Sequence, residues 1–195
     1  MRDIPILFSS PMIRAILSGS KTQTRRVVKL RDLMVSTTKG YAWEFRDKRA
    51  TWNSVSHARL MEMCPYGQPG VDRLWVRESF APRYYGNGSP AYKADWGPLA
   101  EDVCRRPKWK PSIHMPRTLS RITLEVIDVR VQRLNDITDE DAYYEGCVDQ
   151  RDVHGREVDR PTQAFRALWD SINGKRAGCA WSDGPWVWAV TFRRM

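Results

Sequence analysis

The residues best suited to chemistry lie in the segment 19–26, GSKTQTRR, where a lysine and a threonine stand three positions apart. In an extended strand this spacing places Lys21 and Thr24 on opposite faces, whereas a turn places them side by side. Because a helical pattern ends just before them, we favour the turn. A lysine whose pKa is lowered by burial, or by nearby cations such as Arg25 and Arg26, could take the proton of the threonine hydroxyl and make it a nucleophile. Contact of both side chains with phosphate or solvent is the commoner role of such a pair.

Two glutamates are candidates for an acid that would work with these residues. Glu145 ends an acidic helical stretch directly before Gly146, and a carboxylate is unfavourable at a helix C-terminus. A carboxylate in an unfavourable place is sometimes a functional one, although it is more often solvated or paired. Glu78 is the second candidate, and its alternative role is an ion pair with Arg77 or Arg121. The sequence leaves the choice between the two glutamates open.

The charge of the chain favours polyanionic partners. Lys and Arg number 32 against 23 Asp and Glu, which gives a formal net charge of +9 and a pI near 9.6. Binding of such a chain to phosphates is driven by counterion release, although basic charge can also serve solubility alone. Basic residues gather in the segments 21–29 and 104–110, and Trp96 and Trp109 flank or interrupt the second of these. Such a mixture of basic and aromatic residues suits a groove for a nucleic-acid backbone and its stacked bases. The candidate nucleic-acid-binding residues are Arg25, Arg26, Arg105, Arg106, Lys108, Trp109 and Lys110.

The cysteines and histidines predict neither a metal site nor a cofactor. They are scattered, without the close pairs of a zinc motif or the density of a disulfide framework, which favours reduced thiols in a cytosol. The positions are Cys64, Cys104, Cys147, Cys179, His57, His114 and His154. The start of the sequence is unlike a signal peptide, and no run of about 18 apolar residues occurs. We therefore expect a cytoplasmic protein without a membrane span.

The hydrophobic pattern predicts an α+β fold, mostly β with short helices. Helices are expected from Pro11 to Gly19, from Thr138 to Gly146 and over Thr162–Ile172. Strands are expected at Ile4–Phe8, Tyr41–Arg46, Arg73–Ser79, Arg121–Leu134 and Trp186–Phe192. This order favours a partly closed β-barrel covered by the short helices. We expect a single domain over residues 1–195, with long loop insertions at about 29–70, 81–118 and 148–162.

One segment resembles the signature of a known superfamily. Residues Ala15–Arg26 (AILSGSKTQTRR) resemble the ASCH superfamily, in which a helix ends in glycine before Lys-Thr-x-Thr and a following arginine. Segments similar to Gly70–Glu78 and Ile122–Gly146 also recur in that superfamily. The resemblance implies a PUA-like β-barrel, and the whole chain is similar to ASCH-like proteins of bacteriophages and prophages.

The resemblance also implies an activity. Small bacterial ASCH proteins are N(4)-acetylcytidine amidohydrolases with a Lys–Thr–Glu triad, which would make Lys21 the proton acceptor, Thr24 the nucleophile and Glu145 the proton donor. Arg26 or backbone N–H groups would stabilise the oxyanion. This chain departs from the pattern in its insertions and in the bulky Tyr143 and Tyr144 beside the proposed acid.

Two other functions remain open at this stage. Other ASCH proteins are thought to bind or cleave RNA, so a non-catalytic RNA- or DNA-binding module or a ribonuclease is the first alternative. A phage structural or host-interaction protein is the second, supported by nine Trp in 195 residues. The expected partner is RNA, DNA or a modified nucleoside, located in the host cytoplasm if a phage encodes the chain.

Overall fold

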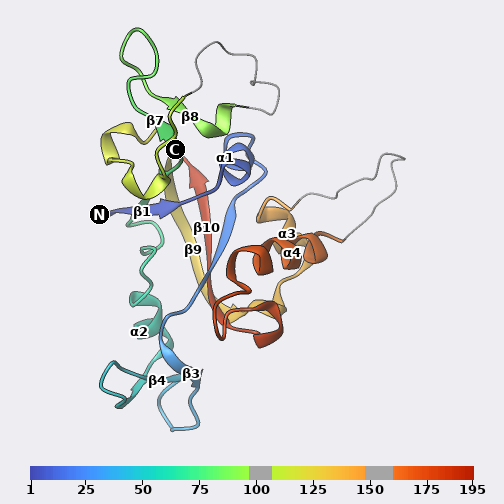
Figure 1. The fold of residues 1–195 in the computed structure, drawn as a ribbon. Coiled ribbons are helices and arrows are strands. Elements are labelled where there is room, and N and C mark those ends of the chain that lie inside the picture. The colour runs from blue at the N-terminus through green and yellow to red at the C-terminus, as the bar shows by residue number, and fades with distance from the viewer. Residues whose placement is uncertain (97–106, 148–159) are drawn as a thin grey trace.

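A five-stranded sheet forms the centre of the computed structural model, which describes residues 1–96, 107–147 and 160–195 (Figure 1). Across this sheet the strands are β1 (Asp3–Leu7), β6 (Arg73–Arg77), β9 (Thr123–Arg133), β10 (Trp186–Arg194) and β2 (Gln23–Val27). The pair β1–β6 is parallel, and the other neighbours are antiparallel.

The longest described strands, β9 and β10, pair with each other inside the sheet. Val187, Trp188, Ala189 and Val190 are all buried, as expected for a central strand covered on both faces. The ladder between β9 and β10 is interrupted by an irregularity at Thr191 and Phe192. Such a bulge increases the local twist of a sheet and helps it to curve.

The two edge strands approach each other without pairing. The Arg26 guanidinium on β2 donates a hydrogen bond to the main-chain oxygen of Leu7 on β1, with an N···O distance of 2.7 Å. Among the described residues no strand ladder joins β1 to β2. The α+β class predicted from the sequence is confirmed, while the described sheet is open between its edges.

Four helices accompany the sheets in the described part of the chain. They are α1 (Ser10–Leu17), α2 (His57–Glu62), α3 (Asp139–Tyr144) and α4 (Pro161–Asn173). Pro11 lies in the first turn of α1, and Gly19 follows that helix with a φ of +82°. The Thr138 hydroxyl accepts a hydrogen bond from the Asp141 N–H and caps α3, as the sequence predicts.

The predicted insertions contain regular structure that the sequence signals only weakly. The segment 29–70 forms the three-stranded sheet of β3 (Arg31–Val35), β4 (Trp43–Arg46) and β5 (Trp52–Val55), followed by α2. Of these elements only β4 was expected. The segment 81–118 contributes to the hairpin of β7 (Phe80–Ala81) and β8 (Ala91–Tyr92). Parts of the predicted insertions 81–118 and 148–162 lie outside the described residues.

Two hydrophobic clusters hold these elements together. The larger one packs α1, α2 and the small sheet against the main sheet. The smaller one joins α3 and α4 to the start of β10 through Ala142, Phe165, Trp169 and Val187. In the described ranges no helix is both long and apolar enough to cross a bilayer.

Asp72, just before β6, anchors the N-terminal end of the chain. Its carboxylate accepts hydrogen bonds from the main-chain and side-chain nitrogens of Arg2 and from the Gln68 N–H. The bonded Arg2 guanidinium lowers the pKa of the Asp72 carboxyl from 3.8 to about 2. Because the folded pKa lies below the unfolded one, this stabilisation is present above pH 3.8 and is lost as the pH falls toward 2.

We therefore expect Asp72→Asn to lower the free energy of unfolding at pH 7 by about 1 kcal/mol, since solvent screens the exposed Arg2. The difference from wild type should shrink between pH 4 and pH 2, as measured by urea unfolding at several pH values. A difference that stayed constant down to pH 2 would contradict this role.

Candidate functional site

The second half of the segment 19–26 belongs to strand β2, and Lys21 before it forms an isolated bridge with Glu145. Thr24 and Arg26 of β2 are aligned with Val190 and Trp188 of β10. The prediction of a turn at Lys21–Thr24 is therefore wrong. Pairing with the buried strand β10 decides the conformation, and the segment's own composition gives no sign of that partner.

Lys21 meets Glu145 directly, although 123 residues lie between them in the sequence. The Lys21 Nζ donates to the Glu145 Oε2 at 2.7 Å and to the Glu145 main-chain oxygen at 2.7 Å. The two side chains are 0% and 4% exposed. Burial lowers the pKa of the Lys21 ammonium, and the attraction of Glu145 opposes that shift. We call these two residues the Lys21–Glu145 pair.

Gly146 makes this close approach possible. Its φ is +87°, and a Cβ at this position would lie 3.1 Å from the Cβ of Ala15 and 3.3 Å from the Cβ of Lys21. A glycine therefore lets the end of α3 rest on α1 and on the lysine stem. The residue that ends the helix also sets the position of Glu145.

Arg25 completes a buried cluster of charges. Its guanidinium contacts the Glu145 Oε1 at 3.2 Å and the Asp141 Oδ2 at 2.7 Å. It also donates to the Gln23 side-chain oxygen at 2.9 Å. The positive charges of Lys21 and Arg25 thus face the negative charges of Asp141 and Glu145. The Arg25 side chain is 0% exposed, so its charge is balanced mainly by the carboxylates of this cluster.

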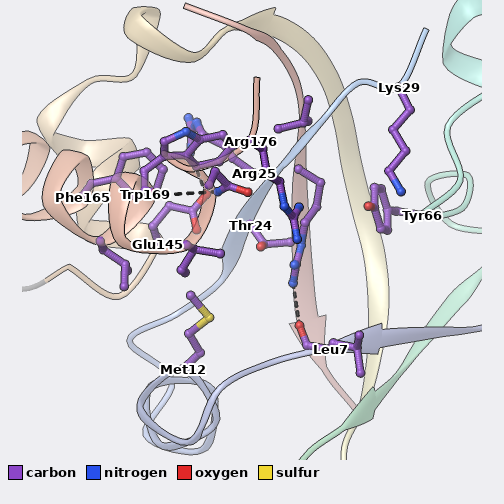
Figure 2. A pocket seen from close by; sticks show the side chains of 15 residues that line it. Leu7, Met12, Thr24, Arg25, Lys29, Tyr66, Glu145, Phe165, Trp169 and Arg176 are labelled. Atoms are coloured by element: carbon purple, nitrogen blue, oxygen red, sulfur yellow. Dashed lines mark hydrogen bonds and ion pairs between the residues drawn. The ribbon is translucent and has the colours of Figure 1, made fainter. Parts of the chain in front are cut away.

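A cavity of about 300 Å³ opens beside the cluster (Figure 2). We call it the first cavity. Strand β2 and Glu145 form one part of its wall, and α4 forms another. Its lining residues are Leu7, Met12, Thr24, Arg25, Arg26, Val27, Lys29, Tyr66, Glu145, Phe165, Leu168, Trp169, Ile172, Asn173 and Arg176. Four cations and a single carboxylate line it, so it suits an electron-rich or anionic ligand.

Thr24 presents a hydroxyl to the first cavity. Its side chain points from β2 toward the side where Glu145 lies (Figure 2), and the residue is 3% exposed. No described residue forms a hydrogen bond with this hydroxyl. Lys21 does not line the cavity and sits behind Glu145. A ligand in the cavity could therefore contact Thr24 and Glu145 directly, whereas Lys21 would act on it only through the Glu145 carboxylate.

Arg26 lies at the junction of the two edge strands. Besides its bond to Leu7, its guanidinium lies 5.3 Å from the centre of the Phe8 ring. Burial lowers the pKa of Arg26, and Tyr66 and Glu145 oppose that shift. Its Nε has no hydrogen-bond partner among the described residues. This Nε is covered from solvent, so it is a buried donor without a partner next to the cavity wall rather than a donor that faces the opening.

The other predicted site residues that the structure describes do not line the first cavity. Glu78 is buried and paired with Arg121 at 2.8 Å, so Glu145 is the glutamate of the cavity. Trp109 packs against Trp96 with ring centres 5.7 Å apart, and the exposed Lys108 and Lys110 flank it in the sequence. Arg105 and Arg106 lie outside the described residues. Tyr143 and Tyr144 are exposed and do not line the cavity.

Several lining residues escaped the sequence analysis. Phe165 and Trp169 lie within the predicted helix Thr162–Ile172, and both line the first cavity as well as packing in the core. Tyr66 and Arg176 lie in segments without a clear pattern, so no signal marked them. In the ranges that the structure describes, no three His, Cys, Asp or Glu side chains are grouped to hold a metal ion.

Comparisons with known proteins concern the fold. No protein-family model and no curated protein matches the chain. Two solved structures are similar in structure. One is an ASCH domain from Lactobacillus crispatus JV V101, with 12% identity, 93% of this chain and 68% of that chain covered, and a TM-score of 0.39. The other is protein EF3133 from Enterococcus faecalis V583, with 10% identity and a TM-score of 0.43; the match covers 100% of this chain and 80% of that chain.

Proposed function

We propose that the first cavity binds an acylated pyrimidine nucleoside or nucleotide and hydrolyses its acyl amide, with N(4)-acetylcytidine as the specific candidate. One observation carries the proposal: the Thr24 hydroxyl, which has no hydrogen-bond partner among the described residues, borders the same cavity as Glu145, and Glu145 is bonded to the buried Lys21 ammonium. The resemblance of the segment 15–26 to ASCH amidohydrolases supports the same assignment.

The rest of the cavity wall suits a nucleoside. Tyr66, Phe165 and Trp169 offer flat aromatic surface to a base, and Lys29 and Arg176 offer positive charge. A volume of about 300 Å³ is at the lower end of the range for small-molecule sites. A single nucleoside fits this scale better than a large ligand.

The proposed reaction uses Thr24 as the nucleophile. Its oxygen attacks the acyl carbon while its proton passes to the Lys21–Glu145 pair. The C–N bond then breaks, and the pair returns the proton to the departing amine. Water hydrolyses the resulting threonine ester and releases acetate. Because only Glu145 reaches the cavity, we assign the proton transfer to the pair as a unit, with Lys21 acting through the carboxylate.

We assign the stabilisation of the oxyanion in this reaction to the guanidinium of Arg26, with backbone N–H groups as the alternative. Its Nε has no partner among the described residues, and the residue borders the cavity beside Thr24. A fixed cation facing the developing negative charge lowers the barrier without having to reorient.

Turnover by the wild-type protein tests the proposal. Incubation with N(4)-acetylcytidine should release cytidine and acetate in equal amounts, measured by liquid chromatography. A panel of other acylated pyrimidine and purine nucleosides would define the specificity. If the folded protein deacylates no member of this panel, the hydrolase proposal is wrong.

Binding of nucleic acid without catalysis is the second candidate. It is favoured by the excess of cations on the first cavity and by the exposed Lys108 and Lys110 next to Trp109. A protein of this kind would bind RNA or single-stranded DNA in a salt-dependent way and would release no cytidine. The turnover measurement therefore separates the two candidates.

A further inference from the structure

A second cavity adjoins the first. Its volume is about 290 Å³, and it is lined by Val27, Lys29, Leu30, Met63, Pro65, Tyr66 and Trp188. Val27, Lys29 and Tyr66 also line the first cavity. In Figure 2 the Lys29 side chain runs toward Tyr66, on the other side of β2 from Glu145 and Trp169. The two cavities are therefore neighbours with a common wall.

The chemistry of the second cavity differs from that of the first. Apart from Lys29 its described lining carries no charge, and Pro65, Tyr66 and Trp188 give it flat apolar surface. It contains no counterpart of Thr24 or Glu145. Such a cavity can hold a planar ring by stacking, without reading a particular hydrogen-bond pattern.

The common wall is where positive charge lies. Lys29, two residues after β2, is exposed at the junction, and Arg26 on β2 is close enough to Tyr66 for each to influence the pKa of the other. A phosphate between two bases would meet these cations as the bases entered the two cavities. A purely apolar ligand, such as a peptide side chain or a lipid tail, would have no use for a lysine at this point.

We infer that the second cavity receives the base of an adjoining nucleotide and that Lys29 contacts the phosphodiester between the two bases. The ligand is then a dinucleotide or a longer single strand rather than a free nucleoside. This inference rests on the proposed function, since the first base must occupy the cavity beside Thr24.

Calorimetric titration of the wild-type protein with unmodified ligands tests the inference. The ligands are the dinucleotides CpU and UpC, and cytidine 3′- and 5′-monophosphate as the matching single nucleotides. We expect at least one dinucleotide to bind about tenfold more tightly than its matching monophosphate, because stacking of one base on an aromatic ring contributes about 1–3 kcal/mol.

A charge placed in the second cavity should remove this advantage. Met63 lines the second cavity and not the first. Met63→Glu should therefore lower the affinity for the dinucleotide to that for the monophosphate, while the affinity for the monophosphate stays unchanged. Met34→Glu is the matched control, because Met34 is exposed on β3 and lines neither cavity. Should Met63→Glu lower the melting temperature, Pro65→Glu at an exposed position repeats the test.

The outcomes separate this inference from the function on which it rests. If none of the four ligands binds, the proposed use of the first cavity fails as well. If monophosphates and dinucleotides bind equally, or if the advantage survives both Met63→Glu and Pro65→Glu, the second cavity is not a base site. In those two cases the proposal for the first cavity stands.

Discussion

Replacing Thr24 by alanine is expected to lower kcat/KM for the deacylation of N(4)-acetylcytidine by at least about 1000-fold, because the substitution removes the attacking oxygen. The loss should fall on kcat, since the cationic and aromatic walls that bind the substrate remain in place. Initial rates of cytidine release measure it. The substitution removes no hydrogen bond to a described residue, so the fold should persist.

Two neighbouring variants serve as controls for this result. Thr24→Ser keeps a hydroxyl at the same position and should retain activity within about tenfold of wild type. Thr22→Ala removes a threonine from the same segment that does not line the first cavity and whose described hydrogen bonds are made by its backbone. It should leave the rate unchanged. Full activity of a folded Thr24→Ala protein would show that the hydroxyl is not the nucleophile.

The fold was predictable from the sequence where a local pattern and burial agree. The alternation of Arg121–Leu134 predicts β9, and the apolar run at Trp186–Phe192 predicts β10. Strand β2 was missed because its sequence, QTRRV, is almost entirely polar, and it is a strand only because β10 pairs with it. Strands β3 and β5 of the small sheet were missed because they are only five and four residues long and largely exposed.

The candidate site was predictable in its parts but not in its arrangement. The residue types of Lys21 and Thr24, and the unfavourable position of Glu145, pointed to three side chains that lie close together in the structure. Their arrangement depends on contacts that no spacing reveals. Lys21 turns toward Glu145 rather than toward solvent, and Arg25, expected on phosphate, faces Asp141 and Glu145. The basic segment and the acidic helix are far apart in the sequence but adjacent in the fold, where they form buried ion pairs. The sequence alone cannot show that the two segments meet.

Replacing Glu145 by alanine is expected to lower the free energy of unfolding by about 3 kcal/mol or more, because it leaves the buried Lys21 ammonium without its carboxylate. Arg25 keeps Asp141 and Gln23 as partners, so the loss concerns mainly the lysine. Urea unfolding followed by far-UV circular dichroism measures the change. Glu62→Ala is the control, since its ion pair with Arg59 is exposed and should contribute less than about 1 kcal/mol. Equal losses in the two variants would contradict the assigned role.

The double variant Lys21→Met with Glu145→Ala tests whether the Lys21–Glu145 pair contributes to stability or to catalysis. If the unpaired charge is the main cost of Glu145→Ala, then replacing Lys21 by an apolar side chain of similar length should recover much of the lost stability. The double variant would then be nearly as stable as wild type, and it should be inactive toward N(4)-acetylcytidine. A buried ion pair that an apolar replacement matches in stability contributes little to folding. Its presence beside a cationic cavity, and beside a hydroxyl that has no hydrogen-bond partner among the described residues, is then explained by the proton transfer that the proposed reaction requires.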